Sequence, residues 1–80
     1  MKIREHRGTL EDSLKTVAEI EPTLEAIAAH INKTDGSAIS PDMITVEEYG
    51  YDPRVLWATH LVSVNGRAWG MTDGPIRGRS

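Results

Sequence analysis

Residue types that can hold an anion are concentrated near the start of the chain, in the stretch 5-EHRGTLEDSLKT-16. A tight turn at Gly8 would expose backbone N–H groups, which form concave sites for anions. Arg7 can add paired hydrogen bonds to a phosphate, and Lys15 can add a point charge. If the stretch is a hairpin, Ser13 lies across the turn from Arg7 and can donate to the same oxygen. The sequence therefore predicts an anion-binding turn with the contacts His6, Arg7, Gly8, Ser13, Lys15 and Thr16.

A solvated turn is the plainer interpretation of this stretch. Glu5, Glu11 and Asp12 lie among the cations and can neutralise them in water. The spacing is not that of a Walker loop, G-x-x-x-x-G-K-[ST], so nucleotide hydrolysis is not expected. Both interpretations of the turn stay open at this point.

A second group of candidate ligand residues lies in 49-YGYDPRVLW-57. Aromatic faces stack on bases, and an arginine beside them can hold a phosphate or a base edge. The alternative is a turn in which Asp52 caps Arg54 while Trp57 enters the core. On the binding interpretation, the ligand contacts are Tyr49, Tyr51, Arg54 and Trp57.

The histidines and carboxylates show no pattern typical of an enzyme or a metal site. His6, His30 and His60 fall on separate predicted elements without a short ligand spacing, so we expect no metal and no cofactor. The sequence has no nucleophile elbow, paired carboxylates or H-x-x-x-H motif. We therefore predict a non-catalytic protein.

Length and composition indicate one small domain over residues 1–80. Such a chain buries only roughly 60% of its unfolded surface. It has no cysteine that could form a stabilising disulfide or a thiolate metal site, so burial against a second copy is the remaining route to stability. We therefore expect a homo-oligomer. The net charge of −3, from nine basic and twelve acidic residues, argues against non-specific DNA binding, which needs a basic face.

Two further expectations concern location and the end of the chain. No run of 18 apolar residues is present to span a membrane, and the N-terminus lacks the apolar core of a signal peptide, so we expect a cytoplasmic protein. The short polar segment 76–80 is expected to be a frayed tail.

Residues 9–20 are ambiguous between a helix and a strand. Apolar residues at helical spacing and a weak capping box at Thr9 favour a helix. Alternating side chains along 13–20 favour a strand, which Glu21-Pro22 would separate from a following helix with Pro22 in its first turn. We favour the strand, which makes 8–12 the turn of a hairpin.

The other elements have clearer signals. Residues 22–33 carry apolar side chains at i, i+3, i+4 and i+7 and form the clearest helix, followed by a loop over 34–41. Asn65-Gly66 is a favoured type I′ hairpin dipeptide. Strands are predicted at 2–7, 43–49, 55–64 and 67–72. The resulting order, ββαβββ, predicts an α+β fold in which one helix covers one face of an antiparallel sheet and the other face is free for self-association.

Three segments, 6-HRGTLEDSLKTV-17, 49-YGYDPRVLW-57 and 70-GMTDGP-75, are similar to those of a group of small accessory proteins of tailed phages and prophages. The resemblance implies a phage gene product that acts in the bacterial cytoplasm. Small phage accessory proteins often counter host defence, so the resemblance implies a counter-defence role by analogy. It implies no catalytic residue.

Two functions follow as hypotheses. In the first, a homo-oligomer binds and sequesters a small anionic, nucleotide-like signal. In the second, the protein inhibits a bacterial defence complex directly, as an anti-CRISPR does, through its acidic surface and an exposed sheet edge. The basic-polar stretch near the start favours the first, whereas the net acidity slightly favours the second.

Overall fold

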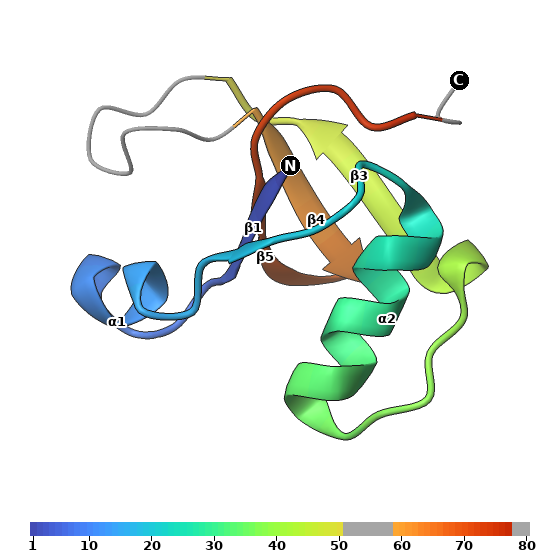
Figure 1. Ribbon diagram of the computed structural model, residues 1–80, viewed down its shortest axis with the longest axis horizontal. Helices are drawn as coiled ribbons and strands as arrows, with labels where there is room; N and C mark the ends of the chain where they lie inside the picture. Colours follow the sequence, from blue (N-terminus) through green and yellow to red (C-terminus); the bar gives the residue numbers. More distant parts are fainter. Residues whose placement is uncertain (51–58, 78–80) are drawn as a thin grey trace.

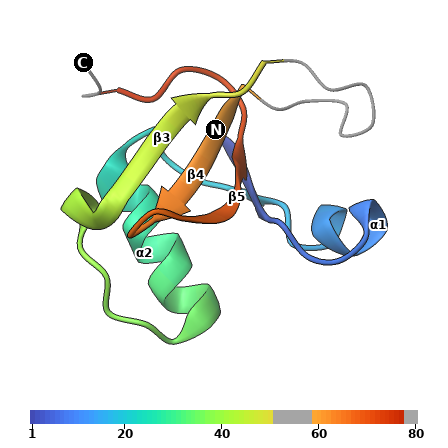
Figure 2. The same cartoon turned by 180° about the vertical axis from the view of Figure 1, so that it is seen from behind.

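A five-stranded antiparallel sheet with one main helix across it forms the fold in the computed structural model, which describes residues 1–50 and 59–77. The elements are β1 Lys2–Glu5, α1 Leu10–Leu14, β2 Ala18–Glu19, α2 Leu24–Asp35, the 3-10 helix η1 Pro41–Met43, β3 Ile44–Glu48, β4 His60–Val64 and β5 Arg67–Thr72. The strand order is β2-β1-β5-β4-β3. α2 lies across one face of this sheet (Figures 1 and 2). The predicted α+β fold is therefore confirmed.

Capping residues define both ends of α2. The Thr23 hydroxyl accepts a hydrogen bond from the backbone N–H of Ala26 at 3.1 Å, which caps the first turn. The helix ends at Gly36, whose φ of 66° is left-handed and suits a residue without a Cβ. Pro22 therefore precedes the cap, and the prediction that it occupies the first turn of the helix is wrong. The helix itself is confirmed, displaced by two residues.

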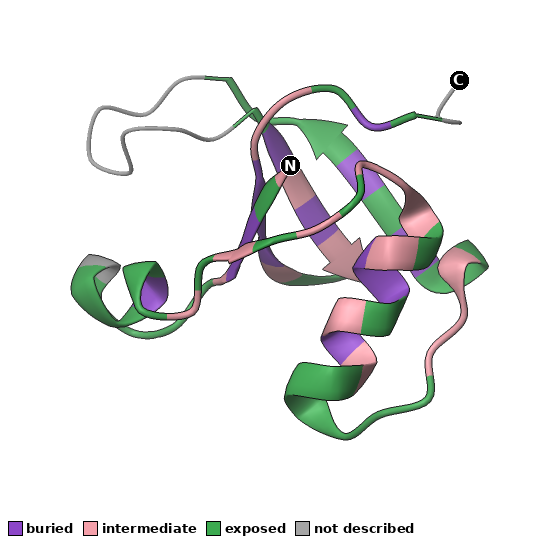
Figure 3. Cartoon of the chain, in the orientation of Figure 1, coloured by how far each residue is buried: buried purple, intermediate pink, exposed green. Residues whose placement is uncertain are grey.

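The core lies between α2 and the strands that it crosses (Figure 3). It consists almost entirely of aliphatic side chains, as expected for a chain without phenylalanine, and full burial of one such side chain contributes about 1.5–3 kcal/mol. Its buried members are Ile3, Ile27, Ala28, Ile31, Ile44, Val46, Val62 and Ile76. These residues come from β1, α2, β3, β4 and the segment after β5, so the core depends on nearly the whole chain.

The region between β1 and β2 differs from the prediction. Residues 10–14 are helical, because the Thr9 hydroxyl accepts from the Asp12 backbone N–H at 3.1 Å and caps them. The strand predicted over 13–20 is limited to Ala18–Glu19, and 8–12 is not a hairpin turn. Leu14 in this segment is 38% exposed. Without burial to enforce alternation, the local cap decides the conformation.

The segment after β5 is part of the folded domain rather than a tail. Ile76 is only 6% exposed and packs in the core. The backbone N–H of Arg77 donates to the carbonyl of Pro22 at 2.7 Å, and its guanidinium contacts Glu21 at 3.1 Å. The expectation of fraying is therefore wrong for residues 76 and 77. No helix in the described part of the chain is long and apolar enough to cross a membrane.

The C-terminal strands follow the prediction closely. β3 and β5 lie within the ranges expected for them. β4 covers 60–64 of the strand predicted over 55–64; Thr59 forms a bend before it, and 55–58 lie outside the described residues. Asn65 and Gly66 join β4 to β5 with φ angles of 51° and 81°. Both angles are positive, as a type I′ turn requires, and the predicted hairpin is confirmed.

Replacing Gly66 by valine should lower the free energy of unfolding by at least about 1 kcal/mol, because a β-branched residue resists positive φ. Chemical denaturation measures the change. Arg67→Val is the matched control, because it adds the same side chain one residue later within β5. Equal stability of the two variants would contradict the turn geometry.

Candidate functional site

The polar side chains of the opening stretch hydrogen-bond mainly to backbone groups of the same stretch. Ser13 is 1% exposed, and its hydroxyl accepts from the Arg7 backbone N–H and donates to the Arg7 carbonyl, both at 2.9 Å. Thr16 accepts from the Glu5 N–H at 3.1 Å and donates to the Ser13 carbonyl at 2.8 Å. The structure brings residues 7 and 13 together, as expected, but it uses Ser13 to hold the loop rather than to face a ligand.

The cations of this stretch are exposed, and carboxylates lie close to them. Arg7 Nε is 2.6 Å from Glu5 Oε1, and this hydrogen bond raises the pKa of Arg7. Lys15 Nζ lies 3.8 Å from Asp12. His6 and Gly8 are also exposed, and the His6 backbone N–H donates to the carbonyl of Trp69. Contact of these residues with an anion stays a prediction, and neighbouring carboxylates already neutralise part of the positive charge on which it depends.

Ser13→Ala should destabilise the protein by about 1–3 kcal/mol, because it leaves the partly buried N–H and carbonyl of Arg7 without their partner. Thermal or chemical denaturation gives the value. Ser37→Ala removes an exposed serine hydroxyl that bonds Asn32, and it should cost well under 1 kcal/mol. If Ser13→Ala is as stable as Ser37→Ala, the hydrogen bonds between Ser13 and the Arg7 backbone do not stabilise the fold as described.

Of the second predicted group, only Tyr49 lies within the described residues. It follows β3, its side chain is exposed, and its backbone N–H donates to the carbonyl of Thr59 at 2.8 Å. Tyr51, Arg54 and Trp57 lie outside the described residues. Base stacking by this group therefore stays a prediction.

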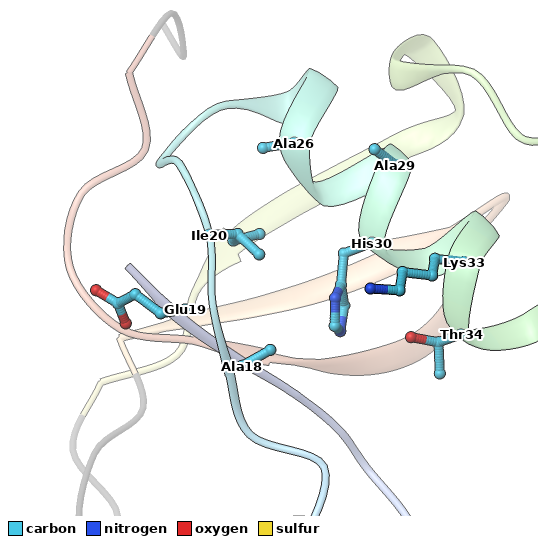
Figure 4. Close-up of a pocket in the computed structure, with 8 residues that line it drawn as sticks. All are labelled: Ala18, Glu19, Ile20, Ala26, Ala29, His30, Lys33 and Thr34. Atoms are coloured by element: carbon cyan, nitrogen blue, oxygen red, sulfur yellow. The ribbon is translucent and has the colours of Figure 1, made fainter.

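A cleft of about 490 Å³ lies between α2 and the segment that contains β2 (Figure 4). One wall is mainly small and apolar. Polar groups enter from α2, where Lys33 extends its ammonium group toward the ring of His30 and Thr34 lies beside them. The lining residues are Ala18, Glu19, Ile20, Ala26, Ala29, His30, Lys33 and Thr34.

Packing holds the imidazole of His30 in place at the cleft. Its ring meets Trp69 edge-on, with centroids 5.9 Å apart and planes at 90°. Trp69 is in turn fixed by its indole N–H, which donates to Asp35 at 2.8 Å. Burial, followed by the charge of Lys33, lowers the pKa of His30, against smaller opposing effects of Asp35 and Glu5. Near neutral pH, the ring is therefore a neutral hydrogen-bonding group beside a permanent cation.

Two of the carboxylates near the cleft form ion pairs with other groups. Glu19 accepts from the N-terminal ammonium of Met1 at 3.1 Å. Glu5, whose charge reaches His30, forms the ion pair with Arg7. Lys33 forms no ion pair with any residue of the described chain. The ammonium group of Lys33 therefore lies unpaired at the cleft above an apolar wall, while the nearby Asp35 carboxylate accepts the indole N–H of Trp69, and this arrangement suits a small anion.

The sequence contains a signal for this cleft that the motif search missed. α2 has two stripes at helical spacing, and the apolar one faces the core. The second stripe is Ala26, Ala29, His30 and Lys33, at i, i+3, i+4 and i+7. Its two alanines leave space where longer side chains would fill the gap. Lys33 is not among the ligand contacts predicted from the sequence.

Comparisons with protein families, with curated protein sequences and with solved structures give no match to this chain.

Proposed function

We propose that this protein is a non-catalytic binding protein whose cleft between α2 and residues 18–20 holds a small ligand with an anionic group and an apolar or planar body. The observation that carries the proposal is the pairing of Lys33 and His30 with an apolar wall in one cleft. The cleft volume of about 490 Å³ falls within the range of small-molecule sites.

Each part of the cleft has a task in this binding mode. Lys33 supplies the charge that attracts the anion, and His30 and Thr34 supply hydrogen bonds that orient it. The apolar wall excludes water from the body of the ligand, which strengthens the charge interaction. The proposal is for binding rather than catalysis because the lining offers shape and charge without a nucleophile held by a base.

The resemblance to phage accessory proteins suggests a biological setting for this binding. A nucleotide-like signal of the host, taken out of solution in the cytoplasm, has both features that the cleft favours: a phosphate and a planar base. Association of several chains would raise the number of ligands held by each assembly. The proposed role is therefore counter-defence by sequestration.

Melting curves with a panel of ligands test the proposal. The panel contains inorganic phosphate, 5′-mononucleotides, cyclic mononucleotides and octanoate. A ligand at 100 times its Kd adds about 2.7 kcal/mol of stability, which raises the Tm of a domain of this size by roughly 10–20 °C. At least one member with both an anion and an apolar body should produce such a shift, and phosphate alone should produce less.

Lys33→Met should weaken this binding at least tenfold, because methionine keeps the helix propensity and the length but removes the charge. Lys15→Met is the matched control: it removes a lysine from the opening stretch, which does not line the cleft. Isothermal titration measures both. Loss of binding in Lys15→Met but not in Lys33→Met would instead favour the anion-binding turn.

Binding of the anion should strengthen as the pH falls below 6.5, the ordinary pKa of histidine. A bound anion favours the imidazolium form of His30, so the ligand raises a pKa that burial lowers in the free protein. The free protein should show the opposite trend. Because the unfolded chain takes up the His30 proton more readily, this residue costs stability as the pH falls below 6.5. Titrations of wild type and His30→Gln between pH 5 and 8 check the assignment, because the variant should lose the pH-dependent part of the affinity.

A further inference from the structure

β3 is an edge strand with open hydrogen-bonding groups. Among the described strands it is last in the order, and β4 is its single partner there. The carbonyl of Met43 and the N–H of Tyr49 bond toward β4, which places the odd-numbered residues on the paired side of the strand. Since the backbone alternates along an antiparallel strand, the N–H and C=O groups of Val46 and Glu48 point away from β4.

This edge lacks the backbone features, a proline or a bulge, that block strand addition. β3 is five residues long, contains no proline, and pairs with β4 in a continuous register without a bulge. No backbone hydrogen bond within the described chain reaches the outward groups of Val46 or Glu48. In Figures 1 and 2, β3 lies at the margin of the sheet.

The sequence around the edge strand is acidic. Residues 34–50 contain four acidic residues and no lysine, arginine or histidine. Glu47 and Glu48 are exposed, and neither forms an ion pair with a described residue. Asp42, just before β3, bonds the Ser40 hydroxyl, which lowers the pKa of its carboxyl group and keeps it ionised. A strand that adds here therefore meets negative charge on both faces of the sheet.

We propose that the open edge of β3 binds an extended, basic segment of a partner protein, which adds a sixth strand to the sheet. The backbone groups of Val46 and Glu48 provide the hydrogen bonds of the added strand, and the carboxylates of Glu47 and Glu48 select lysine or arginine side chains on it. This surface is separate from the cleft beside α2, so it is independent of the proposed ligand.

A second copy of this chain fits the edge less well. Antiparallel pairing of β3 with itself about Val46 would bring the two Glu47 side chains onto one face as diagonal neighbours. Like charges across strands are destabilising, and edge charges of this kind oppose self-association. The lysine or arginine side chains of a basic strand would instead be attracted by the same carboxylates.

The test uses two blocked peptides, acetyl-(Lys-Thr)4-amide and acetyl-(Glu-Thr)4-amide, and the full chain labelled with ¹⁵N. The lysine peptide should protect the amide hydrogens of Val46 and Glu48 from exchange, without a new effect on the Tyr49 amide, which already donates to the carbonyl of Thr59 just before β4. It should bind at least tenfold more tightly than the glutamate peptide at low ionic strength, and added salt should reduce the difference.

Two matched pairs of variants distinguish the contribution of side-chain charge to peptide binding from that of backbone hydrogen bonds. Glu47→Lys should weaken binding of the lysine peptide at least tenfold, whereas Glu11→Lys, an equal change of charge on α1, should leave it within twofold. Glu48→Gln removes only a charge, and Glu48→Pro also removes the outward N–H. Glu48→Pro should therefore bind more weakly than Glu48→Gln at an unchanged Tm, because proline is tolerated where the N–H faces solvent.

Three results would overturn the proposal: equal binding of the two peptides, protection at other strands, or protection of Val46 and Glu48 that grows with protein concentration in the absence of peptide. The last result would make a second copy of the chain the occupant of the edge.

Discussion

Gly70→Ala should lower the free energy of unfolding by about 1–3 kcal/mol, or more if the strands cannot separate. A Cβ on Gly70 would lie 2.1 Å from the carbonyl oxygen of Arg4 and 3.0 Å from its carbonyl carbon. These are backbone atoms of β1, directly beside β5, so no side-chain rotation can relieve the overlap. Since 1 kcal/mol corresponds to about 4–8 °C in a domain of this size, the Tm should fall by roughly 10 °C or more.

Gly66→Ala is the control for this variant. Its Cβ would meet no atom within 4 Å, but the residue has a φ of 81°, so its cost is one of backbone conformation alone. Denaturant titration of both variants compares a steric cost with a conformational one. If Gly70→Ala is as stable as wild type, β1 and β5 are not packed as closely as the structure has them.

Ile27→Ala should cost about 2–5 kcal/mol, the usual range for truncating a fully buried isoleucine. Ile27 is 0% exposed and lies at the centre of the contact between α2 and the sheet. A natural domain has about 0.05–0.15 kcal/mol of stability per residue, so this single change removes a large share of the total for so short a chain.

A graded series identifies the cause of that loss. Ile27→Val should cost about 0.5–1.5 kcal/mol, because it removes one methylene group and leaves a smaller cavity. Leu14→Ala, at a side chain that is 38% exposed on α1, should cost less than Ile27→Ala by at least 1 kcal/mol. Equal losses at Ile27 and Leu14 would mean that α2 does not cover the core as described.

Features determined by neighbouring residues were predictable from the sequence. The hairpin at Asn65-Gly66 follows from a dipeptide that accepts positive φ, and α2 follows from the spacing of its apolar stripe. The prediction for residues 9–20 was wrong because the signals for a helix and for a strand compete there. The helix forms because Thr9 caps it, and because Leu14 is not buried in the core, no packing favours the alternating side chains of a strand.

The candidate site was less predictable, because it depends on packing between distant segments. His30 and Lys33 could be placed on one helix from the sequence, but the cleft exists only where α2 leaves a gap beside residues 18–20. Ser13 shows the reverse case. It was predicted from its residue type as a ligand contact, but its hydroxyl closes the loop onto Arg7. The residue types of the opening stretch therefore suggested anion binding there, whereas the packing of distant segments makes the cleft beside α2 the candidate anion site.

Chemical-shift mapping tests the central claim most directly. The ¹⁵N-labelled chain is titrated with the panel member that raises the Tm most. Saturable shifts should be largest at residues 18–20 and 29–34, with small changes at residues 7–16, and Lys33→Met should abolish them. Shifts centred on the opening stretch, shifts that persist in Lys33→Met, or no saturable shift with any panel member would contradict the claim that the cleft beside α2 is the binding site.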